Sequence, residues 1–294
     1  MNSFLNFKVL IIGVLCFSYS VITAQNLSHP VVDAHCHIRA IPSDAGELIK
    51  IGVKTVMTME EYFDAYKSVD IKYLFGISQA NKGNIKETRT RNDSLFTMSR
   101  RDSRFVPVYS IHPMDGKKAF KELHRVKDLG GKIIKIPVDM RYYSIAGKKM
   151  YKFAIAAGEL DLVLLIDGCG FIYKEDYLGE LLQLTRACPD TKFIIAHMGC
   201  YDWHKLGMVF SSIFKNVWYD LSATVITYAD SPYKAQFEWV IRSVGVDRVL
   251  FGSDQPVCTL LEALDAFYKL DFDDTERERI LYKNAIELLS LPSN

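Results

Sequence analysis

The arrangement of apolar runs restricts the folds open to this chain of 294 residues. Eight short runs rich in Val, Ile, Leu and Phe alternate with longer amphipathic stretches. Each run is almost continuously apolar, as expected for parallel strands buried on both faces. The predicted strands cover residues 31–37, 71–77, 105–111, 132–136, 162–166, 193–196, 217–221 and 248–251. Strands that alternate with helices in this number favour a (β/α)8 barrel, and a doubly wound open sheet is the alternative.

Helical patterns fill the intervals between the predicted strands. Thr58 and Glu61 form a capping-box sequence that predicts a helix start at residue 59. Gly130 and Gly131 end the pattern that begins at Lys117. The predicted helices cover residues 59–68, 117–129, 148–160, 176–187, 204–214, 232–244, 258–268 and 274–289. Because 49% of the chain is apolar and no linker or repeat divides it, we expect a single domain with one large core.

The first 24 residues differ in composition from the rest of the chain. Lys8 precedes an apolar stretch that ends at about Phe17, and small and polar residues follow up to Ala24. This order is typical of a secretory signal peptide, and the apolar stretch is too short for a comfortable transmembrane helix. We expect residues 1–24 to be a cleaved signal peptide and residues 25–294 to be an exported barrel, periplasmic or secreted. A retained membrane anchor is the alternative.

The charges of the expected mature chain are balanced. Removing residues 1–24 removes only Lys8, which leaves 35 basic against 35 acidic residues. Nothing in this balance suggests binding to nucleic acid or to an anionic membrane surface. The five remaining Cys residues are too thinly spread to form a disulfide framework. The expected partner is a small-molecule substrate, and the sequence leaves open whether the chain forms a homo-oligomer.

Ionisable residues stand at the ends of several predicted strands. His35 and His37 are two residues apart, so on a strand their side chains point to the same side. The other strand-end residues are Lys135, Asp167, His197 and Asp254. Charged groups buried there without partners would each be costly, so they need one another, a metal or a substrate. Two imidazoles on one side suit a divalent metal, whereas hydrogen-bonded core histidines and a Lys135–Asp167 ion pair are the alternatives.

Five segments, in this order and spacing, resemble the amidohydrolase superfamily, in particular its amidohydrolase-related branch of metal-dependent hydrolases and decarboxylases. The segments are VDAHCH, IIAHMG, NVWYDLSA, RVLFGSDQP and NAIELL. The resemblance spans about residues 31–290. It implies a (β/α)8 barrel with a divalent metal at its C-terminal mouth. We expect one ion, with zinc in first place and manganese or magnesium as alternatives.

The resemblance also implies a role for each strand-end residue. It places His35 and His37 as metal ligands, and His197 as a residue that binds the metal or polarises the substrate. Asp254 would be a metal ligand that also orients or deprotonates the attacking water. In some members a fourth-strand Lys is carboxylated and bridges two metals. For Lys135 we expect instead a contact to a substrate carboxylate or oxyanion, with an internal salt bridge as the alternative.

Asp167 departs from the family pattern, because relatives usually carry His at this place on the fifth strand. Three interpretations are open. In the first, Asp167 binds the metal, and the oxygen-rich ligand set tolerates manganese or magnesium better than a His-rich one. In the second, Asp167 pairs with Lys135, and the remaining His and Asp residues hold the metal. In the third, the metal is weak or absent, and Asp167 acts as a general base or a substrate contact.

Four residues in the loops after the strands are candidates for substrate binding. They are His112, Arg141, Tyr142 and Trp203. An Arg beside a Tyr suits an anionic or aromatic substrate, although a packing or surface role is the alternative for each residue.

The sequence therefore predicts an exported metal-dependent hydrolase. A metal-activated water would attack an amide, lactone or ester-like bond of a small organic molecule, with Asp254, His197 and Lys135 as the catalytic residues. The closest alternative is a non-oxidative decarboxylase on the same scaffold. A degenerate barrel that binds a small molecule without catalysis is the alternative of another class.

Overall fold

The structure, a computed structural model of the chain, describes residues 29–44, 56–137, 140, 143–172, 175–202, 205 and 214–293. The predicted signal peptide, residues 1–24, lies outside the described residues. The predicted helix 204–214 falls almost entirely outside them as well. Within the described ranges, no helix combines the length and the apolar character needed to cross a membrane.

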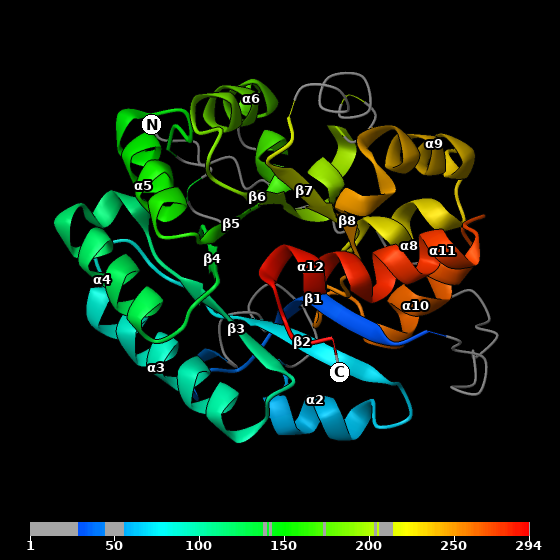
Figure 1. The fold of residues 1–294 in the computed structure, drawn as a ribbon, viewed down its shortest axis with the longest axis horizontal. Helices are drawn as coiled ribbons and strands as arrows, with labels where there is room; N and C mark the ends of the chain where they lie inside the picture. The colour runs from blue at the N-terminus through cyan, green and yellow to red at the C-terminus, as the bar shows by residue number, and fades with distance from the viewer. Residues whose placement is uncertain are drawn as a thin grey trace, which may run out of the picture.

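The described residues form a barrel of eight parallel strands that follow one another in sequence order (Figure 1). The strands are β1 (Val31–His37), β2 (Ile71–Ile77), β3 (Phe105–Ser110), β4 (Ile133–Lys135), β5 (Val163–Ile166), β6 (Phe193–Ile195), β7 (Val217–Asp220) and β8 (Val249–Leu250). Hydrogen bonds join β1 to the segment that contains β8. Ala34 N donates to Phe251 O at 3.0 Å, and His37 N donates to Gln255 O at 2.8 Å. The predicted (β/α)8 barrel is confirmed, and the open-sheet alternative is wrong.

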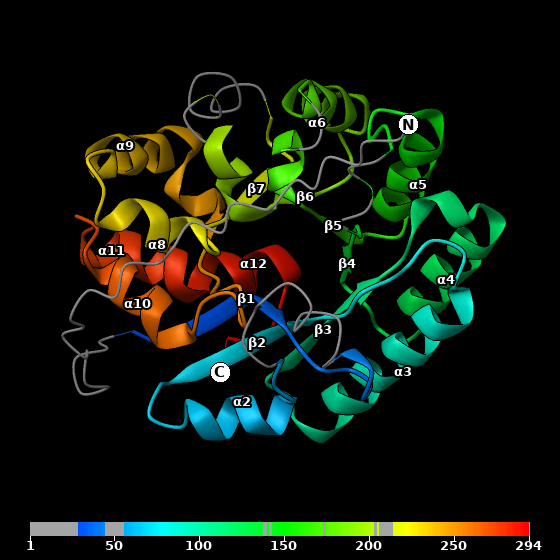
Figure 2. The same ribbon diagram turned by 180° about the vertical axis from the view of Figure 1, so that it is seen from behind.

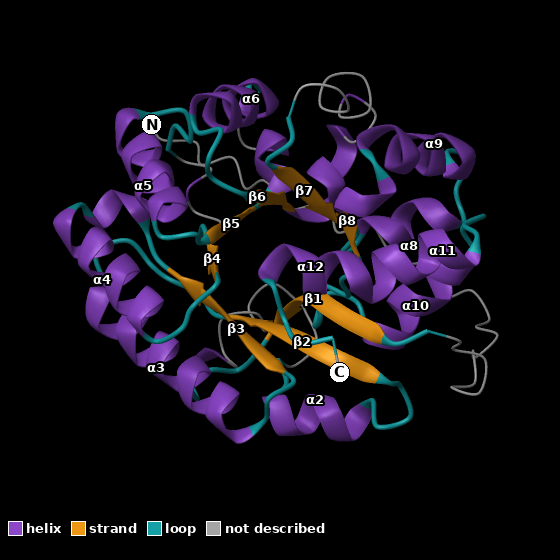
Figure 3. Cartoon of the chain, viewed as in Figure 1, coloured by secondary structure: helices purple, strands orange, loops and turns teal. Residues whose placement is uncertain are grey.

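Helices surround the barrel (Figure 3). They are α2 (Met59–Ala65), α3 (Ile85–Arg101), α4 (Lys117–Asp128), α5 (Lys148–Glu159), α6 (Tyr177–Ala187), α8 (Thr224–Ala229), α9 (Lys234–Val244), α10 (Leu260–Tyr268), α11 (Asp274–Glu278) and α12 (Asn284–Leu289). A π-helical stretch, η7 (Arg279–Lys283), joins α11 to α12. Short 3-10 helices are η2 (Pro113–Asp115), η4 (Gly168–Ile172), η5 (Ala196–Asp202) and η6 (Val246–Arg248).

Helix α3 is absent from the sequence predictions, because its buried face is largely polar. Arg91 Nε donates to Asp44 Oδ1 at 2.8 Å. Asn92 Nδ2 donates to Ser110 O at 3.2 Å and to Glu122 Oε1 at 3.1 Å. These bonds attach α3 to the loop after β1, to β3 and to α4. Polar residues thus fill much of the buried face of the helix, so it lacks the apolar periodicity that reveals its neighbours.

The strands are apolar on both faces because the barrel has two apolar layers. Along β5, Val163 and Leu165 belong to the cluster inside the barrel, and Leu164 and Ile166 belong to the layer under the helices. Residues of α12 join the inner cluster. Asn284 at the start of α12 donates to Val249 O at 2.8 Å, where β8 begins. Helix α12 therefore closes the N-terminal end of the barrel. Figure 2 shows the same ribbon as Figure 1 from behind.

Candidate metal centre

The alternation of side chains along the strands directs three strand-end residues to the inside of the barrel. Ile133, Leu165 and Trp218 pack in or against the inner cluster. Two residues later on each strand come Lys135, Asp167 and Asp220, and all three are buried. Because the strands are parallel, these side chains gather at the C-terminal mouth, where barrels of this class carry their chemistry.

His35 and His37 reach the same mouth from β1. The pairing of β1 with β2 shifts its register between Asp33 and Cys36, an irregularity that re-aims side chains. Asp33 holds the strand in place, because it accepts hydrogen bonds from Tyr62 Oη at 2.7 Å and from Ser253 N at 2.8 Å. Burial raises the pKa of Asp33 to about 6, although these hydrogen bonds act in the opposite direction.

Asp254 lies between the two imidazoles of β1. Its Oδ1 is 3.6 Å from His35 Nε2 and 3.5 Å from His37 Nε2, and its Oδ2 is 4.0 Å from His197 Nδ1. The backbone φ of Asp254 is 64°, in the left-handed region that non-glycine residues rarely adopt. Asp254 N donates to His35 O at 2.8 Å, which holds this conformation. Burial opposes ionisation of Asp254, but the imidazoles of His197, His37 and His35 lower its pKa to about 2.

One ring nitrogen of His35 is buried and has no hydrogen-bond partner among the described residues. His35 Nδ1 lies 2.9 Å from Asp220 Oδ2, and in the described part of the chain Nε2 has no hydrogen-bond partner. Burial lowers the pKa of His35 to about 4 against the attraction of Asp220, so the ring is neutral at pH 7. With the proton on Nδ1 facing the carboxylate, the Nε2 lone pair points towards Asp254 Oδ1. A cation between these two atoms would satisfy both, so the residues present fit a divalent metal.

Asp220 is not among the site residues predicted from the sequence. Its Oδ1 accepts hydrogen bonds from His197 N at 3.0 Å, from Ser222 N at 3.1 Å and from the Ser222 hydroxyl. Burial alone would raise its pKa, but the imidazoles of His35 and His197 and the hydrogen bond from the Ser222 hydroxyl hold the pKa of Asp220 well below its usual range. The signal was present in the sequence, because Asp220 is an ionisable residue near the end of the predicted strand 217–221.

His197 occupies a turn of unusual backbone. The φ angles of His197, Met198 and Gly199 are 57°, 47° and 72°. His197 Nδ1 lies 3.1 Å from Ser222 O and 2.9 Å from the Ser222 hydroxyl. Because a carbonyl only accepts, a proton on Nδ1 would satisfy the first contact and would leave the lone pair of the neutral ring on Nε2. His197 Nε2 is 3.8 Å from Asp167 Oδ1. Burial alone lowers the pKa of His197, but the facing carboxylates raise it overall.

Lys135 and Asp167 share the mouth without forming a pair. Asp167 Oδ1 accepts a hydrogen bond from Cys169 N at 3.0 Å and faces His197. The contacts among the described residues include no ion pair between Lys135 and Asp167, so the geometry does not favour the second interpretation of Asp167. Lys135 ends β4 and is buried, and its positive charge acts to lower the pKa values of both His35 and His197.

Of the four predicted substrate-binding residues, His112 lies among the described residues. His112 is buried, its Nδ1 accepts from Met114 N at 3.1 Å, and its ring packs edge-on against Tyr143 at 5.7 Å. His112 therefore caps η2, a structural role that its sequence position did not reveal. Arg141, Tyr142 and Trp203 lie outside the described residues.

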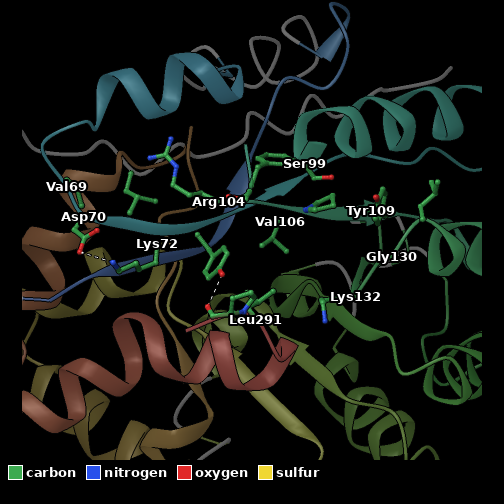
Figure 4. Close-up of a pocket in the computed structure, with 17 residues that line it drawn as sticks. Val69, Asp70, Lys72, Ser99, Arg104, Val106, Tyr109, Gly130, Lys132 and Leu291 are labelled. Atoms are coloured by element: carbon green, nitrogen blue, oxygen red, sulfur yellow. Dashed lines mark hydrogen bonds and ion pairs between the residues drawn. The ribbon is translucent and has the colours of Figure 1, made fainter. Parts of the chain in front are cut away.

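Two cavities lie at different ends of the barrel. A cavity of about 130 Å³ at the mouth is lined by Cys169, His197, Cys200 and Asp254, among others. Another, of about 610 Å³, is lined by residues that precede or begin β2, β3 and β4 and by the C-terminal Leu291 and Pro292 (Figure 4). The starts of parallel strands lie opposite the mouth, so the larger cavity is separate from the candidate centre.

Comparisons with known proteins agree with this architecture. Residues 32–291 match a protein family described as amidohydrolase. A comparison with curated protein sequences finds no match.

Three solved structures are similar in fold. The 2,6-dihydroxybenzoate decarboxylase from Rhizobium is 18% identical, and the match covers 89% of this chain and 98% of that chain with a TM-score of 0.66. The 5-carboxyvanillate decarboxylase from Sphingomonas paucimobilis is 14% identical, and the match covers 90% of this chain and 100% of that chain with a TM-score of 0.65. A dihydroxybenzoic acid decarboxylase from a Polaromonas species, with bound manganese and an inhibitor, is 15% identical. This match covers 89% of this chain and 96% of that chain with a TM-score of 0.66.

Proposed function

Because the chain belongs to the amidohydrolase family, we propose that it is a metal-dependent hydrolase of a small organic substrate with an amide, lactone or ester-like bond. The observation that carries the proposal is the buried, unpartnered His35 Nε2 that faces the Asp254 carboxylate at 3.6 Å. A buried lone pair beside an ionised carboxylate is costly unless a cation lies between them.

His35, His37 and Asp254 would hold the ion, with Asp167 next to them at the mouth, where it faces His197. When bound, the ion would lower the pKa of a water molecule towards neutrality and polarise the bond to be cleaved. Imidazole and carboxylate ligands suit zinc. The manganese in the Polaromonas decarboxylase makes manganese the second ion to test.

The side chains around the ion would move the proton and stabilise the developing charge. Asp254, whose pKa is about 2, is ionised at neutral pH and would orient or deprotonate the attacking water. His197, held by Ser222 and by the backbone bond to Asp220, would polarise the substrate. The Lys135 ammonium would contact the oxyanion or a substrate carboxylate.

The test is hydrolysis by protein that has been stripped of metal and reloaded with zinc, manganese or magnesium. A panel of lactones, esters and amides would be followed by proton release and by chromatography of the products. We expect turnover that requires metal, that Asp254→Asn abolishes and that Asp128→Asn leaves unchanged, because Asp128 lies at the end of α4, far from the mouth. Turnover by the stripped protein or by Asp254→Asn that equals the turnover of the metal-loaded wild type would overturn the proposal.

Non-oxidative decarboxylation is the second candidate, and Lys135 favours it. This ammonium is buried at the mouth, and no carboxylate among the described residues forms an ion pair with it, so it is suited to hold a carboxylate of the substrate. A panel of hydroxybenzoates with detection of carbon dioxide distinguishes the reactions. Release of carbon dioxide without hydrolysis of any lactone, ester or amide would replace the first proposal with the second.

We also propose that residues 1–24 direct export of the barrel that begins at residue 25. Expression in a Gram-negative host, followed by fractionation and N-terminal sequencing, tests this. A mature chain that starts near Gln25 outside the cytoplasm is expected, and an intact Met1 in the cytoplasm would contradict it.

A further inference from the structure

Two cysteine thiols lie beside each other at the mouth, on the segments that follow β5 and β6. Cys169 belongs to η4 and Cys200 to η5, and the two thiols are hydrogen-bonded to each other. Both residues are partly exposed, and both line the cavity of about 130 Å³ at the mouth. Two thiols that are in contact and open to solvent can be reached by an oxidant.

The backbone holds the two segments together at the residues that precede the cysteines. A Cβ on Gly168 would lie 2.1 Å from Ala196 O and 2.8 Å from Gly199 Cα, so the two backbones are in direct contact there. The second segment is anchored further, because Thr224 Oγ1 donates to His197 O at 2.6 Å. The pairing of the thiols therefore follows from the packing of the backbone, and not from the rotation of two exposed side chains.

The segment after β6 also has a backbone conformation that needs support. Cys200 has a φ of 57° and a ψ of −118°, and the three residues before it have positive φ angles as well. Such conformations are costly for non-glycine residues and persist only where the surrounding structure holds them. A covalent bond from Cys200 to the neighbouring segment would hold the end of this turn.

We propose that Cys169 and Cys200 are a site of oxidative modification and form a disulfide that links η4 to η5. The oxidant is itself a disulfide, of a small thiol compound or of a thiol oxidoreductase, as exported proteins encounter. The thiolate of one cysteine attacks a sulfur of the oxidant, whose disulfide bond breaks and releases one thiol. The thiolate of the other cysteine then attacks the mixed disulfide and releases the second thiol.

This reaction is balanced and separate from the proposed hydrolysis. The two cysteines lose two electrons and two protons, and both leave on the two thiols of the reduced oxidant. The reaction uses neither a metal nor a substrate. Its test therefore stands or falls independently of the proposed function.

Glutathione buffers measure how strongly the fold favours the disulfide. The whole chain, kept in a chelator, would be equilibrated at a series of ratios of reduced to oxidised glutathione. Acid quenching, alkylation and peptide mapping by mass spectrometry would then identify the linked cysteines. We expect a peptide linked through Cys169 and Cys200 in the wild type, and alkylation of both cysteines after treatment with dithiothreitol.

The same titration in urea gives the reference for the unfolded chain. A disulfide that stabilises a fold is easier to form in that fold by the same factor. Disulfides typically stabilise enough for the native chain to favour the link about thirtyfold to a thousandfold over the unfolded chain. Equal values in buffer and in urea would overturn the proposal, and this comparison needs no variant to fold.

Variants identify the partners of the link. Cys258→Ser is the matched control, because Cys258 is also partly exposed, and it should form the link as the wild type does. Cys200→Ser should stop at a mixed disulfide between Cys169 and glutathione. A wild type that stops at mixed disulfides, or that links Cys258 instead, would overturn the proposal.

Discussion

Replacement of Asp220 by Asn tests how the barrel prepares His35 for a metal. Asp220 Oδ2 faces His35 Nδ1 at 2.9 Å, and Oδ1 accepts hydrogen bonds from His197 N and Ser222 N. An Asn keeps one oxygen for the two backbone N–H groups and must then turn its NH₂ towards His35. An NH₂ group donates, so Nδ1 becomes the acceptor and the ring proton moves to Nε2. The variant therefore blocks the nitrogen that we assign to the metal.

The expected loss of metal affinity follows from the role of Asp220, which holds the ring of His35 in place. Removal of such a partner weakens metal binding about tenfold to hundredfold, which corresponds to about 1.4 to 2.8 kcal/mol. The loss should lie at the upper end of this range, because Asp220 is fully buried and the ring cannot turn to water instead.

Competition with a chromophoric chelator would measure the dissociation constant for zinc in the wild type and in Asp220→Asn. Circular dichroism of the metal-free proteins would show that the variant is folded. Asp128→Asn, a change at the end of α4 and away from the mouth, is the matched control and should bind zinc as the wild type does. A folded Asp220→Asn with wild-type affinity would refute the assignment of His35 Nε2 as a ligand.

Three further perturbations test other parts of the structure. The pKa of Asp33 is about 6 in the fold against an ordinary value of 3.8, so the folded chain binds this proton more tightly than the unfolded chain. The stability of the wild type relative to Asp33→Asn should therefore fall by up to about 3 kcal/mol as pH rises from about 4 to 6. Urea unfolding of both proteins at a series of pH values would measure this. A stability difference between them that does not change with pH would contradict the prediction. Gly168→Ala should destabilise the protein by about 1 to 3 kcal/mol in the same assay, because its Cβ would overlap Ala196 O. Unchanged stability would mean that the segments that follow β5 and β6 are not in contact at Gly168. Lys135→Met should weaken inhibition by benzoate about tenfold to hundredfold with little change in zinc affinity, and equal inhibition of both proteins would show that Lys135 does not contact carboxylates.

The strands were predictable from the sequence because both of their faces are buried. Every predicted strand coincides with an observed one to within a few residues at each end. Helix α3 was not predictable by the same reasoning, because Arg91 and Asn92 use polar partners where neighbouring helices use apolar contacts. Apolar periodicity thus reveals elements that pack by burial and misses one that packs through hydrogen bonds.

The strand-end residues were also visible in the sequence, but their pairings were not. The structure brings His35, His37, His197 and Asp254 together and places Asp167 beside His197 instead of Lys135. The left-handed turn at His197 and the register shift of β1 decide these neighbours, and neither follows from residue spacing. Asp220 was predictable in principle, because it is an ionisable residue near the end of the predicted strand 217–221.

The most direct test of metal dependence is a crystal structure of zinc-loaded protein with anomalous data collected at the zinc edge. The account predicts an anomalous peak at about 2.0 to 2.2 Å from His35 Nε2, His37 Nε2 and an Asp254 oxygen. Full zinc loading with no peak near His35 Nε2 would contradict the central claim that this buried nitrogen is a metal ligand.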